Sequence, residues 1–312
     1  MSSALVKDLQ AGLGLDSAQL QRLVERAPHT YKIYSIPKRS GGSRIIAQPA
    51  KETKIIQRWL ISTVFSRLPV HDCATAYSSG SSIKLNASRH VGGDYLSKFD
   101  FKNFFSSILE RDVASHLSAY LGDTLNKSEI ALVARVSCIK LVADNRLCLS
   151  VGAPSSPAIS NAVMFDFDCR IERWCQEHAI SYTRYADDLT FSSTRKGLAN
   201  DIEAVIRGTL KELPYPRLTL NDDKTTHVSK KHQRRVTGII INSQGELSMG
   251  RERKRLISAL IHRFSVGELP AVDVFRLQGL LGFAVDIEPR FLTSMRAKYG
   301  SPVIDSILKI RK

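Results

Sequence analysis

Hydrophobic residues recur along this chain with two different periods, and each period predicts a class of element. They alternate with polar residues at 31–37, and a short apolar segment at 45–47 follows a basic, glycine-containing turn, which together predict a β-hairpin with cations at its tip. A helical period predicts amphipathic helices over residues 52–67, 159–174 and 198–213. Because strands and helices are interspersed without strict alternation, the pattern favours an α+β fold with helices on one face of a sheet.

Two adjacent carboxylates, Asp187 and Asp188, lie between two short β-prone segments. A tight turn between two strands can direct both side chains towards one region. Two negative charges about 4 Å apart repel by roughly 4 kcal/mol at an effective dielectric of 20, so the pair indicates either full solvation or a bound divalent cation. Magnesium prefers hard oxygen ligands and shares carboxylates with phosphates, which makes it the natural candidate.

A third carboxylate, Asp100, follows a predicted strand and precedes a turn in largely apolar surroundings. Alone, such a residue is as often a helix cap or a turn former. If its strand neighbours the strand of Asp187 and Asp188, the three carboxylates would form a two-metal site for phosphoryl transfer. Asp222 and Asp223 are a rival pair, but their Asn-led turn composition favours a solvated turn.

Two further acidic residues, Asp166 and Asp168, fall within the helix predicted over residues 159–174. We expect them to be exposed.

Several motifs, in a fixed order over roughly residues 30–300, resemble the reverse transcriptases. Asp100 matches the first catalytic aspartate, Tyr185–Asp188 the catalytic hairpin, and Gly152–Pro157 the template and nucleotide loop between them. Asn86–His90 and Val236–Gly238 are similar to two motifs that mark the bacterial retron branch. The ordered set is far more specific than any one of its members.

The resemblance implies a right-hand polymerase fold of the α+β class, with fingers, palm and a helical thumb. The implied parts are an N-terminal helical segment (1–30), fingers (31–97 and 106–160), palm (98–105 and 161–242) and thumb (243–312).

The resemblance also implies roles for single residues. Asp100, Asp187 and Asp188 are the expected catalytic residues and, with the main-chain carbonyl of Phe101, would hold two Mg²⁺ ions about 3.5–4 Å apart. The residues expected to bind the incoming nucleotide are Lys38, Arg44, Phe105, Gly152 and Lys224.

Two positions bear on nucleotide selection. The ring of Phe105 would leave no room for a 2′-hydroxyl, so the resemblance implies a preference for deoxynucleotides; the alternative is that Phe104 and Phe105 both belong to the core. Val151 stands where many reverse transcriptases have glutamine, so any contact made by that glutamine is absent.

Charge points to a polyanionic partner. The 312 residues carry a net charge of +15, and residues 224–265 contain ten Lys or Arg against two Glu. Cations on one surface of a helical bundle suit contacts to a duplex backbone, although a solvated charged face remains an alternative. For His90 we expect a structural or an RNA-contacting role. The expected nucleic-acid-binding residues are Asn86, His90, Arg234, Arg235, Val236, Thr237, Gly238, Arg251, Arg253, Lys254 and Arg255.

The five cysteines form no C-x-x-C pair and have no nearby histidine ladder, which argues against a zinc site and a disulfide framework. The N-terminus has no apolar run behind a basic start, and no segment approaches the roughly 18 apolar residues that span a bilayer. These features predict a cytoplasmic protein with no membrane partner.

The resulting hypothesis is an RNA-directed DNA polymerase of retron type that uses dNTPs. The resemblance implies a dedicated structured RNA as template and primer, an internal 2′-hydroxyl as the priming group, a branched RNA–DNA product, and a role in anti-phage defence with an accessory effector protein. One alternative is a reverse transcriptase of group II intron or diversity-generating type; the absence of a maturase or endonuclease extension weighs against the intron type. Another is a non-catalytic RNA-binding scaffold, which the three intact aspartates argue against.

Overall fold

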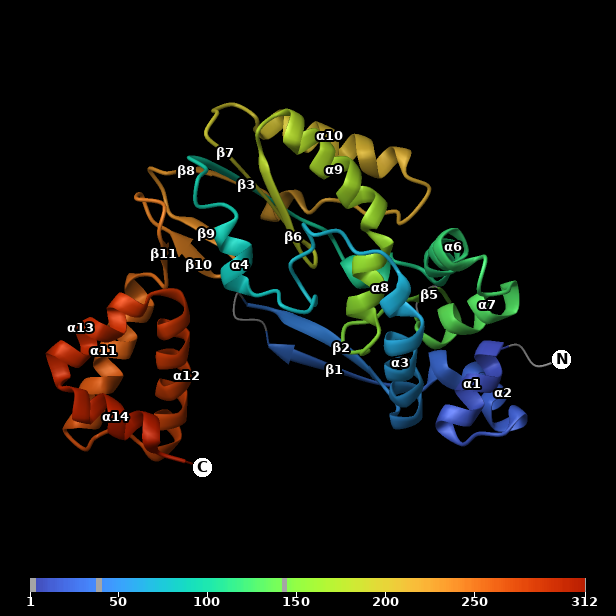
Figure 1. The fold of residues 1–312 in the computed structure, drawn as a ribbon, viewed down its shortest axis with the longest axis horizontal. Coiled ribbons are helices and arrows are strands. Elements are labelled where there is room, and N and C mark those ends of the chain that lie inside the picture. The colour runs from blue at the N-terminus through green and yellow to red at the C-terminus, as the bar shows by residue number, and fades with distance from the viewer. Residues whose placement is uncertain (1–3, 38–40, 142–144, 312) are drawn as a thin grey trace. The chain divides into compact units, whose positions relative to one another are not determined.

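The computed structural model describes residues 4–37, 41–141 and 145–311 (Figure 1). Lys38, one of the residues predicted to bind the nucleotide, lies outside the described residues. The chain divides into two compact units, each built from several segments. The first comprises residues 1–79, 98–189 and 197–226, and the second comprises 80–97, 190–196 and 227–312. The boundaries between fingers, palm and thumb stay a prediction.

The first unit begins with two short helices, α1 (Ala4–Leu13) and α2 (Ser17–Arg26). A capping box begins α2: the Asp16 side chain accepts a hydrogen bond from Gln19 N at 2.7 Å, and the Gln19 side chain accepts one from Asp16 N at 2.9 Å. Helix α3 (Lys51–Thr63), continued by a 3₁₀ turn (Phe65–Arg67), matches the helix predicted over residues 52–67.

The predicted β-hairpin is also present. Strands β1 (Tyr31–Pro37) and β2 (Ser43–Pro49) pair in antiparallel register, with Ile36 opposite Arg44. The first unit also contains the α-helices α5 (Phe104–Ser107), α6 (Glu110–Leu121) and α7 (Lys127–Val136) and the strands β4 (Ile139–Lys140) and β5 (Leu147–Cys148).

A four-stranded sheet of order β6-β7-β3-β8 carries the site described below. Its strands are β6 (Ser181–Tyr185), β7 (Asp188–Ser193), β3 (Tyr95–Asp100) and β8 (Thr226–Ser229). Helix α9 (Phe165–Glu177) contacts both β6 and helix α10 (Ala199–Glu212), and α10 matches the helix predicted over residues 198–213. This mixture of helix and sheet confirms the predicted α+β class.

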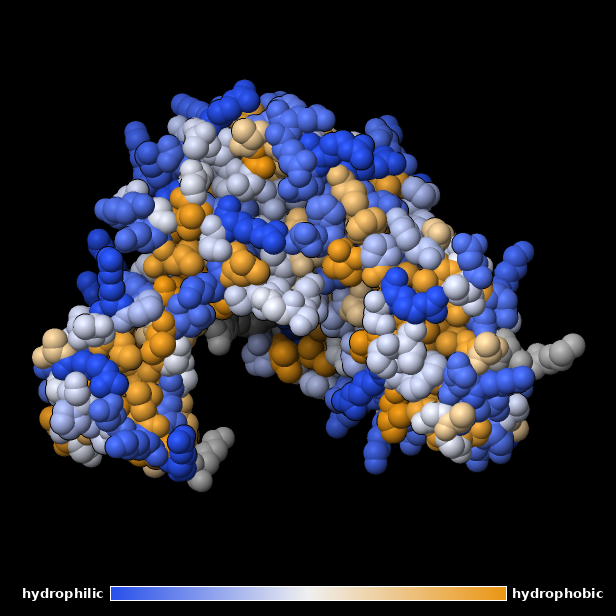
Figure 2. Space-filling model, viewed as in Figure 1, coloured by the Kyte–Doolittle hydropathy of each residue, from blue (hydrophilic) through white to orange (hydrophobic). Residues whose placement is uncertain are grey.

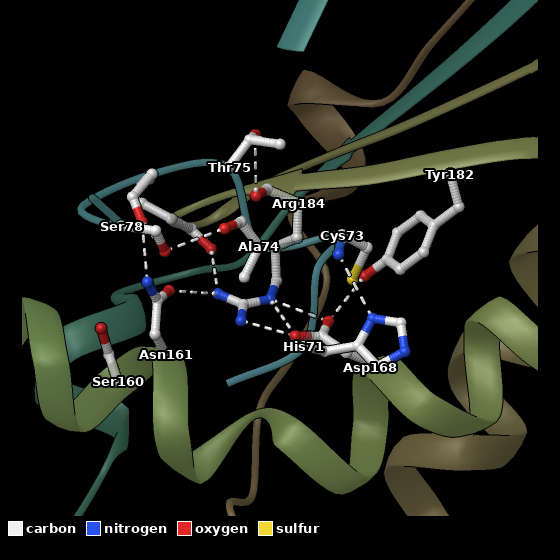
Figure 3. A network of polar contacts seen from close by, with 12 residues as sticks. His71, Cys73, Ala74, Thr75, Ser78, Ser160, Asn161, Asp168, Tyr182 and Arg184 are labelled. Carbon is white, nitrogen blue, oxygen red and sulfur yellow. Dashed lines mark hydrogen bonds and ion pairs between the residues drawn. The ribbon is translucent and has the colours of Figure 1, made fainter. Parts of the chain in front are cut away.

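The single helix predicted over residues 159–174 is wrong, because the chain forms two helices there. Helix α8 (Ser156–Val163) ends at Met164, whose φ of −85° and ψ of 1° interrupt the helical path, and α9 starts at the next residue. The physical reason is the set of buried polar contacts made on either side of the break. The break allows Asn161 at the end of α8 and Asp168 in the first turn of α9 to contact the same buried side chain, Arg184 (Figure 3).

The second unit combines a three-stranded sheet with a helical bundle. The sheet has the order β11-β10-β9, from β9 (Arg234–Val236), β10 (Ile239–Ile241) and β11 (Leu247–Ser248), and helix α4 (Ile83–Ser88) contacts it. The bundle contains α11 (Arg251–Ser265), α12 (Ala271–Ile287), α13 (Pro289–Tyr299) and α14 (Ser301–Lys309), as predicted for a helical C-terminal part.

The bundle has its own core, in which Ile257, Leu277, Leu281, Ile304 and Ile307 are fully buried. Figure 2 shows apolar residues running along these C-terminal helices between hydrophilic ones. In the described part of the chain, no helix has the length and hydropathy needed to cross a membrane.

Candidate active site

Asp100 is the last residue of β3 and is almost completely buried. The next residue, Phe101, donates its N–H to the main-chain oxygen of Asp187 at 3.2 Å. On the other side, Asn221 N donates to the main-chain oxygen of Asp100 at 2.7 Å. Strands β3 and β7 are therefore neighbours, as the two-metal hypothesis requires, and the structure brings the first carboxylate beside the Asp187–Asp188 pair.

The pair lies at the hairpin between β6 and β7, whose connection consists of Ala186 and Asp187 alone. Ala186 has a φ of +57° and is 5% exposed. A left-handed conformation at a non-glycine residue costs on the order of 1–2 kcal/mol, so the surrounding structure has to enforce it. A tight turn with one positive φ is what directs the following carboxylates away from a regular strand path.

Burial and neighbouring negative charge raise the pKa of Asp187 and of Asp188. Burial, followed by the charge of Asp100, raises the pKa of Asp187 above its usual value. The pKa of Asp188 is raised to about 6, mainly by burial. The charge of Lys98 partly opposes this rise, whereas the charges of Asp187 and Asp100 and a hydrogen bond with the Asp100 carboxyl add to it. The site therefore resists carrying three full negative charges without a compensating cation.

One compensating charge comes from Lys224, which ends a short 3₁₀ helix (Asp222–Lys224). Its Nζ donates to Asp100 Oδ1 at 2.8 Å and to Oδ2 at 3.0 Å. These hydrogen bonds are the main reason why the pKa of Lys224 is raised. The rival pair behaves as a surface turn, since Asp222 and Asp223 are exposed and Asp222 pairs with Arg207.

The donor set fits a divalent metal ion. Within the described residues no group of three or more His, Cys, Asp or Glu side chains is already arranged as a metal site. The chemistry of the three aspartates nonetheless suits a hard cation, because all their donor atoms are oxygens and the raised pKa values of Asp187 and Asp188 show that positive charge would be favourable there. The residues that could hold such an ion are Asp100, Asp187, Asp188 and the main-chain carbonyl of Phe101.

A cleft of about 750 Å³ opens beside the aspartates. It is lined by residues of the β1–β2 hairpin, by the end of β3 and α5, by the loop after β5, and by Tyr77, Asp187 and Lys224. Phe105 is half-buried and lines this cleft, whereas Phe104 is buried and stacks on Phe101 with ring centroids 5.7 Å apart. Phe104 therefore belongs to the core, whereas Phe105 does not, and the alternative that both phenylalanines are core residues is wrong.

The loop that contains Gly152 lies directly against strand β2. Ala47 N donates to Val151 O at 2.8 Å, and Gly152 has a φ of +118°. A Cβ on Gly152 would come within 2.9 Å of Ile46 Cγ2 and 3.0 Å of the Ala47 oxygen. Glycine is needed here because the two backbones approach closely. Its neighbour Val151, which stands where many reverse transcriptases have glutamine, lines the cleft. Arg44 from β2 lines the cleft as well.

In the second unit, several residues predicted to bind nucleic acid are buried. Asn86, His90 and Val236 are 0% exposed, and Arg234 is 2% exposed with its guanidinium donating to main-chain carbonyl groups. His90 Nδ1 lies 2.8 Å from Ser192 Oγ, and burial lowers the pKa of His90 to about 3. These side chains do not reach the surface of the unit, so for His90 the burial favours the structural alternative.

The two segments that resemble retron motifs meet each other inside the second unit. Asn86 Nδ2 donates to Thr237 Oγ1 at 3.4 Å, and Thr237 Oγ1 donates to the Ile83 carbonyl at 3.2 Å. Thr237 and Gly238 have φ values of 45° and 84° and form the two-residue turn between β9 and β10. The contact ties helix α4 to this β-hairpin.

The residues of the predicted nucleic-acid-binding set that are not buried fall into two groups, those that contact other side chains and those that are exposed. Arg253 lies 4.7 Å from the ring centroid of Phe283, and Lys254 forms an ion pair with Glu288. Exposed members of the predicted nucleic-acid-binding set are Arg235, Gly238, Arg251 and Arg255.

An ion pair that the sequence did not reveal lies behind the hairpin. Asp168, expected to be exposed, is 0% exposed and pairs with Arg184, which is also 0% exposed (Figure 3). The prediction was wrong because Asp168 lies three and seven residues before the buried Ile171 and Cys175, and this spacing places it on the apolar side of the helix. The same periodicity could have identified it.

Comparison with known proteins agrees with this geometry. Residues 36–241 match the family model described as reverse transcriptase (RNA-dependent DNA polymerase). The Retron Ec83 reverse transcriptase of Escherichia coli is 42% identical over 289 residues, which cover 92% of this chain and 93% of that protein. The Retron Mx162 reverse transcriptase of Myxococcus xanthus is 33% identical over 304 residues, covering 89% of this chain and 62% of that protein.

Among solved structures, telomerase of Candida albicans, in a complex with a fragment of telomeric RNA, superimposes with a TM-score of 0.52 at 13% identity. The match covers 94% of this chain, which spans 59% of the telomerase chain, and it supports the right-hand polymerase fold. The family match, the retron relatives and the three aspartates beside a cleft lead to one conclusion: this chain belongs to the reverse transcriptases, RNA-directed DNA polymerases, and within them to the bacterial retron branch.

Proposed function

We propose that this polymerase copies part of a dedicated structured non-coding RNA into single-stranded DNA, starting from an internal 2′-hydroxyl of that RNA and leaving a branched RNA–DNA product. We further propose that it acts in anti-phage defence together with an accessory effector protein. The support for the retron type is the similarity to the Retron Ec83 and Retron Mx162 reverse transcriptases over about nine-tenths of this chain.

The observation that carries the catalytic part is the convergence of Asp100, Asp187 and Asp188 beside a cleft that also contains Phe105. The three aspartates, with the Phe101 carbonyl, would hold two Mg²⁺ ions. When bound, these ions would activate the primer hydroxyl and neutralise the leaving pyrophosphate.

The remaining side chains of the cleft bind and orient the nucleotide. Arg44 lies exposed on β2 and presents its guanidinium for hydrogen bonds to phosphate oxygens. The side chain of Lys224 is 59% exposed, so its flexible stem can move from Asp100 to a triphosphate. Lys38 is proposed to add a further positive charge from the hairpin turn, outside the described residues. Phe105 lines the cleft, and its ring is proposed to exclude a 2′-hydroxyl and so select dNTPs.

The proposal is tested by purifying the protein from cells that carry its native locus and extracting the bound nucleic acid. The extract is run before and after RNase and DNase treatment, beside the extract from an Asp187→Asn/Asp188→Asn double variant. We expect a defined DNA species with a short RNA branch that is absent from the variant. RNA alone in both samples would refute the polymerase proposal and favour an RNA-binding scaffold.

A defence role is tested separately by challenging cells carrying the locus with a panel of phages. Protection by the wild-type locus that disappears with the double variant is the expected result. Equal plaque numbers with and without the intact locus over the whole panel would contradict the defence proposal and leave the polymerase proposal standing.

A further inference from the structure

The ion pair behind the hairpin is completely enclosed. Arg184 Nε lies 2.9 and 3.0 Å from Asp168 Oδ1 and Oδ2, and Arg184 Nη2 lies 2.6 Å from Oδ2. Tyr182 donates its hydroxyl to Asp168 Oδ1 at 2.9 Å. Figure 3 shows the guanidinium pointing from the hairpin strand towards the two helices that carry Asp168 and Asn161.

The same guanidinium also contacts the turn that carries the catalytic aspartates. Arg184 Nη1 donates to the main-chain oxygen of Ala186 at 3.2 Å and to Asn161 Oδ1 at 3.1 Å. The Ala186 carbonyl and the Asp187 nitrogen belong to one planar peptide unit, so a restraint on this oxygen also fixes the orientation of the bond leading into Asp187. The hydrogen bond thus restrains the backbone at Ala186, whose left-handed conformation has to be stabilised by its surroundings.

Main-chain hydrogen bonds hold Arg184 itself in place. Arg184 N donates to Cys73 O at 2.8 Å, and Arg184 O accepts from Thr75 N at 2.9 Å. Asn161 Nδ2 donates to Ala76 O at 2.7 Å, next to Tyr77, which lines the cleft. One buried side chain is thus joined to the catalytic turn and, through Asn161, to a wall of the cleft.

Stability alone does not explain this arrangement. A buried ion pair is often no more stabilising than well-packed hydrophobic residues of similar volume, because both charges lose their hydration. What an apolar replacement cannot supply is the hydrogen bond to the Ala186 oxygen.

We propose that Arg184, held by Asp168, is a positioning residue for the catalytic hairpin: its hydrogen bond to the Ala186 carbonyl sets where the carboxylates of Asp187 and Asp188 lie relative to Asp100. The inference rests on the proposed metal site. Residues that orient metal ligands change metal affinity by about 10–100-fold when they are replaced, so we expect an effect of this size.

The test measures Mn²⁺ binding directly, from the electron paramagnetic resonance signal of free Mn²⁺ at increasing protein concentration. The main variant replaces the ion pair by apolar residues of similar size, Asp168→Leu with Arg184→Met, and its folding is checked by urea denaturation. We expect its Kd for Mn²⁺ to rise about 10–100-fold, and saturating Mn²⁺ to restore much of its polymerase rate.

The matched control is Tyr182→Phe, which removes a hydrogen bond to the same Asp168 but leaves the bond from Arg184 to Ala186. It should bind Mn²⁺ within twofold of wild type. If the paired replacement does not fold, Arg184→Lys keeps a charge next to Asp168 but cannot also reach the Ala186 oxygen, and it should weaken Mn²⁺ binding by at least fivefold.

Measuring Asp188→Asn in the same assay distinguishes a failure of the positioning role from a failure of the proposed metal site. Wild-type binding that is lost in Asp188→Asn but unchanged in a folded Arg184 variant would overturn the positioning role alone. Absence of Mn²⁺ binding by the wild-type protein would overturn the metal site and the inference together.

Discussion

Replacing Asp188 by asparagine should stabilise the metal-free protein at neutral pH. The rise of the Asp188 pKa from 3.8 to about 6 is caused mainly by burial and by neighbouring negative charge. At 1.36 kcal/mol for each pH unit, a rise of this size corresponds to about 3 kcal/mol. Because the carboxyl is only partly buried and neighbouring charges can readjust, we expect a gain of about 1–3 kcal/mol in the free energy of unfolding.

The sign of the pH dependence follows from proton binding. At pH 4–6 the folded protein still binds the Asp188 proton while the unfolded chain has begun to lose it. The free energy of unfolding of the wild type therefore falls, relative to Asp188→Asn, as pH rises through this window. The difference between the two proteins should grow from about pH 4 to pH 6 and stay constant above it.

The measurement is urea denaturation of both proteins in EDTA, from pH 4.5 to pH 8, with Asp223→Asn as the control for an exposed aspartate. The control should follow the wild type within about 0.5 kcal/mol at every pH. Millimolar Mg²⁺ should reduce the advantage of Asp188→Asn, since a bound cation stabilises the wild-type carboxylate. An unchanged or lower stability of Asp188→Asn at pH 7 in EDTA would refute the reasoning.

Two other predictions concern the walls of the cleft. Gly152→Ala should lower the free energy of unfolding by about 2–4 kcal/mol, because its φ is +118° and its Cβ meets strand β2, whereas Gly208→Ala in the open part of α10 should raise it by about 0.5–1 kcal/mol. Equal stability of the two variants in urea would contradict the close approach at Gly152. Phe105→Val should reduce the preference for dATP over ATP, measured as a ratio of kcat/KM, by about 10–100-fold. An unchanged ratio would show that another residue excludes the 2′-hydroxyl.

The sequence was most informative where local chemistry and local structure agree. Asp187 and Asp188 could be identified because a carboxylate pair between two β-prone segments is unusual whatever surrounds it. The hairpin at residues 31–49 and helix α10 follow directly from the period of their apolar positions. The resemblance singled out Phe105, but only tertiary structure could show that Phe104 is buried while Phe105 lines the cleft, because consecutive residues at the start of a helix differ little in sequence context.

Other features depend on contacts between distant segments. No proline or glycine stands at Met164 to predict the break from the sequence. The break is stabilised by polar contacts of α8 and α9 with Arg184 in strand β6, which follows them in the chain. Likewise, similarity to a family motif identifies Asn86 and His90 as special positions but does not say whether they face solvent. Their complete burial was decided by packing against β-strands from other parts of the chain.

The contact between Asn86 and Thr237 limits how this enzyme can be recombined with its relatives. The two motif segments are about 150 positions apart in the sequence, yet a side-chain hydrogen bond joins them, and one of its partners also bonds to the first turn of α4. A chimaera with a crossover point between them would combine an α4 from one parent with a β9–β10 turn from the other. Domain exchange that aims to change RNA specificity should therefore transfer both segments from the same parent.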